Sequence, residues 1–167
     1  VLVLGPGPLS PETGTAPAYA SWKTARLLSE EGFEVVGMDP SDTSLLTLPG
    51  CCSRFYPEPL AAESVEAVLE KERPGYLAGY STGAGGMFLC ARLFRSGALK
   101  RNGCEMLGPS LQAIHRTQDR ALFKEVLMDA DLYIPRFVSV LSLQDGIKAM
   151  HRVGFPLVVR PHYSSGG

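Results

Sequence analysis

The chain has 167 residues, of which 45% are hydrophobic and 20% are charged. This length and composition suffice for one large or two small packed cores and exclude disorder as the dominant state. Sixteen Lys and Arg residues against seventeen Asp and Glu residues leave a formal net charge of -1, so no strong field draws the protein to nucleic acid or to an anionic membrane. No apolar run approaches the roughly 20 residues that cross a bilayer. We therefore expect a soluble, cytoplasmic protein without nucleic-acid or membrane partners.

The cysteines and the two ends of the chain give two further expectations. The sequence holds four cysteines: Cys51, Cys52, Cys90 and Cys104. They show no Cys-x-x-Cys spacing, and an adjacent pair is a poor geometry for a disulfide or for zinc, so we expect buried or idle thiols in a reducing compartment. Val1 already lies inside an apolar run, and Gly167 lies inside a glycine-rich segment. We therefore expect a piece of a longer chain.

Strand and helix patterns alternate along the first two thirds of the sequence. The apolar run at residues 1–4, closed by Gly5, is typical of a buried parallel strand. The same reasoning predicts helices over residues 18–31, 63–72 and 87–94, further strands over residues 34–38, 76–80 and 104–107, and a flexible turn over residues 83–86. Right-handed crossovers between such units give a doubly wound parallel sheet covered by helices on both faces. We assign this α/β domain to residues 1–109.

A second, smaller unit is expected over residues 110–167. The patterns predict helices over residues 110–117, 119–130 and 142–153, the last capped by Ser142 or Gln144, and strands over residues 136–141 and 157–160. This unit starts a new alternation of helix and strand and stops before completing it.

A glycine-rich turn follows the first predicted strand. Gly5-Pro6-Gly7-Pro8-Leu9-Ser10 invites comparison with the dinucleotide fingerprint G-x-G-x-x-G, but Ser10 replaces the third glycine and the two prolines remove N–H donors. Asp39, at the end of the second strand, stands where an acidic residue takes a ribose hydroxyl in such sites. We favour a tight strand-to-loop turn with a solvated aspartate over a nicotinamide site.

Other candidate motifs are weaker. Thr82-Gly83-Ala84-Gly85-Gly86 lies at the carboxyl edge of the predicted sheet, where ligands bind in this fold class, but it has no Gly-Lys-Ser/Thr ending. It is a flexible connection or a ligand contact, and the sequence leaves both open. The histidines are scattered, and no Gly-x-Ser-x-Gly elbow supports a serine nucleophile.

Two arginines have unusual positions. Arg160 ends an apolar run before a Ser- and Gly-rich loop, which places a fixed cation and free backbone N–H groups where a polyphosphate could lie. A capped strand with a flexible tail fits equally well. Arg120 stands in the first turn of a predicted helix, where the helix dipole disfavours a cation without a partner. A salt bridge to Asp119 or Glu125 is the alternative explanation.

Taken together, seven segments appear in the order seen in the large chain of carbamoyl-phosphate synthase, and the resemblance covers nearly the whole sequence. The segments are Gly5-Pro6-Gly7-Pro8, Glu30-Glu31-Gly32-Phe33-Glu34-Val35, Tyr56-Pro57-Glu58-Pro59-Leu60, Glu70-Lys71-Glu72-Arg73-Pro74, Ser96-Gly97-Ala98-Leu99, Asp119-Arg120-Ala121-Leu122-Phe123-Lys124-Glu125 and Gly154-Phe155-Pro156-Leu157-Val158-Val159-Arg160-Pro161. The chain most resembles the amino-terminal, carboxyphosphate-forming half of that family.

The resemblance implies a pre-ATP-grasp domain over residues 1–109 and the start of an ATP-grasp domain after it. It also implies a ligase of pyrimidine and arginine biosynthesis that uses ATP, bicarbonate and ammonia and works with a glutaminase small chain. The ATP contacts of the family map onto Arg120, Arg160, Gly166 and Gly167. The carboxylates that hold Mg²⁺ in the family fall beyond residue 167, so we expect no catalytic residue and no metal ligand in this piece, and no activity from it alone.

Three loops depart from the family pattern. Pro11-Glu12-Thr13 and Ala16-Pro17-Ala18-Tyr19-Ala20 replace Ile-Gly-Gln and Glu-Phe-Asp-Tyr-Ser, Asp39-Pro40-Ser41-Asp42 replaces Asn-Ser-Asn-Pro, and Thr82-Gly83-Ala84-Gly85 replaces Gly-Gly-Gln-Thr. All three follow predicted strands at the same rim of the sheet. A divergent, non-catalytic nucleotide-binding or assembly module is therefore the alternative to a synthase, and a nicotinamide-dependent oxidoreductase ranks last.

Overall fold

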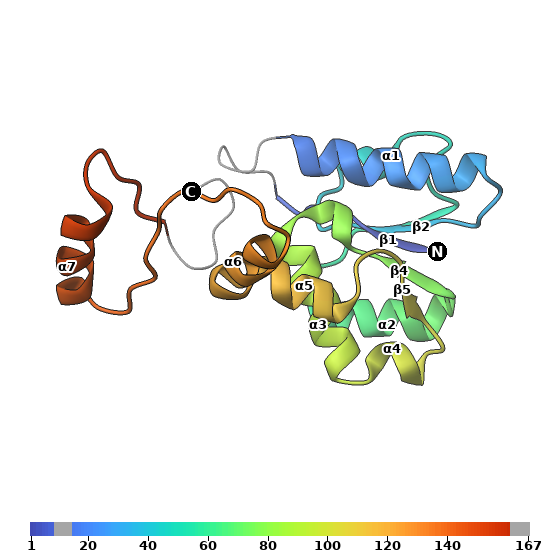
Figure 1. Cartoon of the computed structure of the whole chain (residues 1–167). Helices are drawn as coiled ribbons and strands as arrows, with labels where there is room; N and C mark the ends of the chain where they lie inside the picture. Colours follow the sequence, from blue (N-terminus) through green and yellow to red (C-terminus); the bar gives the residue numbers. More distant parts are fainter. Residues whose placement is uncertain (9–14, 161–167) are drawn as a thin grey trace. The chain divides into compact units, whose positions relative to one another are not determined.

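The computed structural model describes residues 1–8 and 15–160 (Figure 1). The chain divides into two compact units, Val1–Ile114 and His115–Ser165. The boundary that the sequence predicts at residue 109 stays a prediction. In the part of the chain that the structure describes, no helix combines the length and the apolar character that crossing a membrane requires.

The first unit is built on a five-stranded, all-parallel sheet in the order β3-β2-β1-β4-β5. The strands are β1 (Leu2–Leu4), β2 (Val36–Met38), β3 (Arg54–Tyr56), β4 (Tyr76–Ala78) and β5 (Glu105–Met106). In the centre, Leu2 of β1 lies opposite Val36 of β2 and Leu77 of β4. The predicted doubly wound parallel sheet is confirmed.

Helices cover both faces of this sheet. They are α1 (Ala16–Glu30), α2 (Ala62–Glu72), α3 (Ala84–Arg95) and the short α4 (Ala98–Arg101). Figure 1 shows α1 on one side of the strands and the other three helices on the opposite side. Each face therefore has its own hydrophobic core.

The central strand β1 supplies side chains to both cores, because successive strand residues point to opposite faces. Leu2 and Leu4 pack into the core formed with α2, α3 and α4, and Val3 packs into the core formed with α1. All three side chains are fully buried, and each contributes about 1.5–3 kcal/mol to folding by leaving water. This two-sided burial explains the uninterrupted apolar run.

The helix α3 begins earlier than its sequence pattern predicts. Gly83 precedes it with φ +81°, a left-handed conformation that a glycine adopts without strain. The helix then starts at Ala84, so the flexible turn predicted over residues 83–86 is wrong for Gly85 and Gly86, which lie in its first turn.

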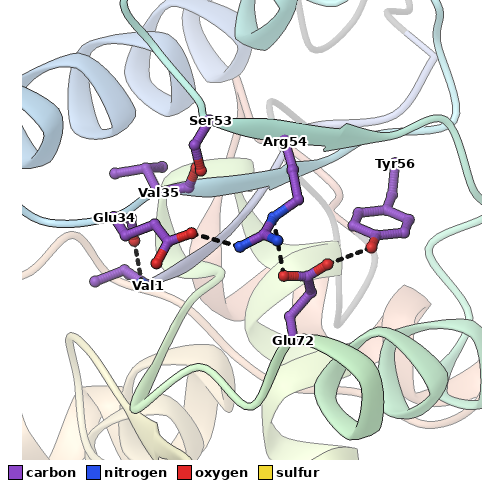
Figure 2. Close-up of polar contacts among 7 residues, drawn as sticks. All are labelled: Val1, Glu34, Val35, Ser53, Arg54, Tyr56 and Glu72. Atoms are coloured by element: carbon purple, nitrogen blue, oxygen red, sulfur yellow. Dashed lines mark hydrogen bonds and ion pairs between the residues drawn. The ribbon is translucent and has the colours of Figure 1, made fainter.

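The edge strand β3 was not predicted from the sequence. Its side chains bind Glu34 and Glu72 in neighbouring segments (Figure 2). Arg54 forms an ion pair with Glu34, just before β2, and its Nε lies 3.1 Å from the carboxylate of Glu72 at the end of α2. The Tyr56 hydroxyl donates a hydrogen bond to the same carboxylate. The Glu72 side chain is only 5% exposed. Because Glu72 is the last residue of α2, its contacts with Arg54 and Tyr56 join β3 to that helix.

The second unit contains the helices α6 (Arg120–Asp129) and α7 (Leu143–Val153), and α5 (Leu111–Gln118) spans the boundary before them. Asp119 caps α6 by accepting hydrogen bonds from the backbone N–H groups of Ala121 and Leu122. Ser142, one of the two predicted caps of α7, accepts a hydrogen bond from the Asp145 N–H at 3.1 Å. The helices of this unit are therefore close to the predicted ones.

The strands predicted over residues 136–141 and 157–160 are wrong. Both segments are irregular and belong to no sheet among the described residues. Val158 and Val159 are each 84% exposed, and Leu141 is fully exposed. An apolar run becomes a strand only when a neighbouring strand pairs with its backbone, and none of the described residues does so here.

Candidate functional site

The carboxyl edge of the parallel sheet is where ligands bind in this class of fold. Two of the three divergent loops lie there in described parts of the chain, after β2 and after β4. The third is only partly described, because Pro11-Glu12-Thr13 lies outside the described residues. Its other half, residues 16–20, forms the first turns of α1.

The loop after β2 is organised around Asp39. The residue is 1% exposed. One carboxylate oxygen accepts a hydrogen bond from the Ser41 N–H at 2.9 Å, and the other accepts one from the Ser44 hydroxyl at 3.1 Å. The expectation of a solvated aspartate is therefore wrong, because the side chain turns back into its own loop and is covered by the end of β1.

Gly5 explains how the Asp39 carboxylate can be covered in this way. A Cβ atom on Gly5 would overlap the Asp39 side chain, so only a glycine leaves the space. The Gly5 N–H donates to the carbonyl of Met38 at 2.7 Å, which keeps the two strand ends together. The predicted tight turn after β1 is thus present, and its aspartate is an internal group rather than an outward hydrogen-bond partner for a ribose.

The glycines near β4 and α3 also have packing roles. A Cβ on Gly79 would overlap the Cys90 sulfur, and a Cβ on Gly86 would overlap the Thr82 hydroxyl. That hydroxyl donates to the Gly79 carbonyl at 2.8 Å. Close approach of α3 to β4 therefore accounts for Gly79 and Gly86, whereas Gly85 faces open space. The structure favours a packed connection over a phosphate-binding loop.

A small hollow lies beside this connection. Its volume is about 10 Å³, room for about one water molecule. Its lining is mainly apolar and includes Leu77, Tyr80, Met87, Met106 and Ile114. It is too small for a nucleotide.

The predicted ATP-binding residues lie in other parts of the chain. Arg120 is the first residue of α6 and is half-buried, and Arg160 is exposed in the irregular segment after α7. Gly166 and Gly167 lie outside the described residues. Nothing in the geometry tests a nucleotide contact by any of the four, so their role in ATP binding stays a prediction.

The cysteine thiols are weakly reactive. The expected burial is confirmed for Cys51, Cys90 and Cys104, and Cys52 is half-buried. Burial raises the pKa of Cys52 to about 12 and that of both Cys90 and Cys104 to about 11, so each of these three is a protonated, weakly nucleophilic thiol at neutral pH. Within residues 1–8 and 15–160, no three His, Cys, Asp or Glu side chains gather into a metal site.

These features define a class of protein. A five-stranded parallel sheet with helices on both faces is a doubly wound α/β domain, a class that binds its ligands at the carboxyl ends of the strands. The sequence model of the family described as "Carbamoyl phosphate synthase preATP-grasp domain" matches residues 1–116. The chain belongs to this family.

Relatives extend the match over the whole chain. The amino-terminal section of the carbamoyl phosphate synthase large chain of Aquifex aeolicus is 33% identical over 100% of this chain and 30% of its own length. The large chain of Methanothrix thermoacetophila is 35% identical over 100% of this chain and 16% of its own length. The chain therefore spans less than a third of either relative.

Solved structures support the fold. The N5-carboxyaminoimidazole synthetase of Staphylococcus aureus, complexed with ADP, is similar over 98% of this chain and 38% of its own, with a TM-score of 0.56 and 22% identity. The corresponding ribonucleotide synthetase of Thermotoga maritima gives a TM-score of 0.54 at 17% identity, over 93% of this chain and 36% of its own.

Sequence reasoning missed two features of the site region. One is the burial of Asp39 against Gly5, and the other is the cluster of Arg54, Tyr56 and Glu72. The alternation of Arg54 and Tyr56 around Phe55 carried a weak strand signal. Nothing local pointed to Glu72 as their partner.

Proposed function

We propose that this chain is the amino-terminal part of an ATP-grasp ligase of the carbamoyl-phosphate synthase type. The observation that carries the proposal is the match of the family to residues 1–116, together with relatives of that name along the whole chain. In the complete protein, ATP phosphorylates bicarbonate to an acyl phosphate and releases ADP. Ammonia then attacks the carbonyl carbon and displaces phosphate, which gives carbamate on the way to carbamoyl phosphate. A glutaminase small chain is the proposed source of the ammonia.

The two arginines are assigned to the phosphate groups of ATP. A guanidinium presents several N–H donors in a fixed plane and stays charged, so it can hold phosphate oxygens while negative charge shifts between them. Gly166 and Gly167 are assigned to the same nucleotide through their backbone N–H groups. Mg²⁺, when bound, neutralises charge on the phosphates. Because the described residues contain no cluster of three metal-ligating side chains, no step is assigned to a metal held by this piece.

The test is made in the full-length protein with Arg120→Ala and Arg160→Ala. Each substitution is expected to reduce bicarbonate-dependent ATP hydrolysis at least tenfold while the domain stays folded, as a thermal melt shows. Arg152→Ala, at an exposed position of α7, is the matched control and is expected to keep full activity. If the substitution of one arginine leaves ATP hydrolysis unchanged, that arginine is not part of the ATP site.

A non-catalytic nucleotide-binding or assembly module is the second candidate. The inward-turned Asp39 and the packing role of Gly86 favour it, because both loops depart from the family pattern at the rim of the sheet. Unchanged hydrolysis for both arginine variants, or ATP binding without any bicarbonate-dependent turnover, would support this module over the synthase.

A further inference from the structure

We propose that Tyr80 is a positioning residue, which holds the start of α5 on the first unit and thereby steadies the chain that leads to Arg120. The inference rests on the proposed function, in which Arg120 binds ATP, and it names a residue that acts on that site without touching the nucleotide. Tyr80 begins the short 3-10 helix η2 (Tyr80–Thr82) after β4, and it is 40% exposed.

The ring of Tyr80 lies against the backbone of Gly108, in the connection between β5 and α5. A Cβ atom on Gly108 would lie 2.6 Å from the ring carbon Cδ1 of Tyr80, and the other atoms nearest to it belong to the same ring. Gly108 also has φ +124°, a conformation that residues with a side chain rarely adopt. Two separate restrictions therefore favour glycine at the point where the ring covers the chain.

The first turn of α5 is attached to the same region of the first unit. The Ser110 hydroxyl accepts a hydrogen bond from the Ala113 N–H at 3.1 Å, and the Ser110 carbonyl accepts one from the Ile114 N–H at 2.9 Å. Ile114 is 3% exposed and is the only buried residue of α5, a helix that the structure describes in full. Its side chain lines the small hollow together with Tyr80 and Met87.

The backbone between this attachment and Arg120 is helical except at Asp119. α5 continues to Gln118, and the Asp119 N–H donates to the His115 carbonyl at 3.2 Å. Asp119 then caps α6, whose first residue is Arg120. Because a helix moves as a rigid element, a change in the first turn of α5 is transmitted to its last turn. Loosening the attachment of α5 therefore loosens the chain next to Arg120.

The kinetic effect of losing the ring follows from this arrangement. Tyr80→Ala leaves Gly108 uncovered, with the conformational freedom of a glycine. The fraction of molecules in which Arg120 is placed for ATP then falls, and the apparent affinity for ATP falls by the same factor. Molecules that have bound ATP correctly react as before, so we expect KM for ATP to rise about fivefold while kcat stays within about twofold.

The test compares three variants of the full-length protein. Tyr80→Ala removes the ring, Tyr80→Phe keeps the ring and removes only the hydroxyl, and Tyr76→Ala removes a ring of nearly equal exposure, 42%, from β4. Amide hydrogen exchange over residues 110–118 measures how firmly α5 is held, and bicarbonate-dependent ATP hydrolysis gives KM and kcat. Tyr80→Ala is expected to exchange about tenfold faster in this segment and to show the higher KM, whereas Tyr80→Phe and Tyr76→Ala match the parent protein in both.

Two results would overturn the proposal. Unchanged exchange in Tyr80→Ala would show that the ring does not hold α5, and faster exchange with an unchanged KM would show that α5 does not position the ATP site. If Tyr80→Ala does not fold, Gly108→Ala, whose Cβ would overlap the ring, displaces the ring and carries the same expectation. If the parent protein shows no bicarbonate-dependent hydrolysis, the synthase proposal fails, and the affinity of the same variants for Mg-ATP still decides the role of Tyr80.

Discussion

The guanidinium of Arg54 lies against a nearly buried carboxylate: its Nε is 3.1 Å from an oxygen of Glu72, whose side chain is 5% exposed (Figure 2). Glu72 stands in the last turn of α2, where the helix dipole disfavours a negative charge. The hydroxyl of Tyr56 donates to the same carboxylate. Arg54 therefore offsets a charge that would otherwise be costly to bury, and in doing so it ties the edge strand to the helix.

Arg54→Ala is expected to lower the free energy of unfolding by about 2 kcal/mol, because it leaves the Glu72 carboxylate with a single neutral donor in a nearly buried position. Urea denaturation measures this loss. Arg92→Ala is the control, since its ion pair with Glu63 is largely exposed on both sides, and such pairs contribute about 0–1 kcal/mol. Equal losses for the two variants would contradict the role given to Glu72.

Gly5→Ala is expected to destabilise the first unit by about 3 kcal/mol or more, because the added methyl group would overlap the Asp39 side chain in a packed region. Thermal unfolding followed by circular dichroism measures the effect. Gly75→Ala is the control, because a Cβ at Gly75 meets no atom within 4 Å. A melt of Gly5→Ala close to that of the parent chain would mean that Asp39 does not lie against Gly5.

The sequence predicted the parts of the fold that depend on local patterns. Four strands and the main helices were found, because apolar runs such as residues 1–4 end at a glycine or a proline and alternate with helical spacing. The edge strand β3 was missed because Arg54 and Tyr56 are held by Glu72, a partner far along the chain. The strands predicted over residues 136–141 and 157–160 were wrong because an apolar run forms a strand only beside a second strand, and the sequence pattern does not show whether one is present.

The same distinction holds for the candidate site. The turn at Gly5 could be predicted from its glycines and prolines, and Asp39 was recognised as a residue at the end of a strand. Its orientation could not be predicted, because it depends on space left by Gly5 on another strand and on the Ser44 hydroxyl five residues later. The roles of Arg120 and Arg160 were predicted from their places in the sequence together with the resemblance, and they stay predictions.

Raising the pH from about 8.5 to 10.5 is expected to destabilise the first unit through its buried thiols. Burial raises the pKa of Cys52 to about 12 and that of Cys90 to about 11, whereas an unfolded thiol loses its proton near pH 8.5. The unfolded chain therefore binds fewer protons in this window, so the free energy of unfolding falls as the pH rises. Each pKa unit is worth about 1.4 kcal/mol.

The measurement is urea denaturation at several pH values in a reducing buffer. Cys52→Ala is less stable at every pH, because it leaves a gap, but its stability is expected to fall less steeply above pH 8.5 than that of the parent chain. Parallel curves for the two proteins would show that the Cys52 thiol titrates in the folded state as it does in the unfolded one.

The 167-residue chain, taken alone, is expected to bind Mg-ATP weakly, with a dissociation constant above about 100 μM. The argument starts from Arg160, which is exposed and follows two valines that are each 84% exposed. When an exposed arginine binds a phosphate, ordering its side chain costs roughly 2 kcal/mol of conformational entropy. Without other residues held in place around the nucleotide, the binding free energy that offsets this cost is small. Calorimetric titration measures the affinity, and Arg160→Ala should change it less than threefold. Submicromolar binding that Arg160→Ala abolishes would mean that this chain already contains a formed nucleotide site.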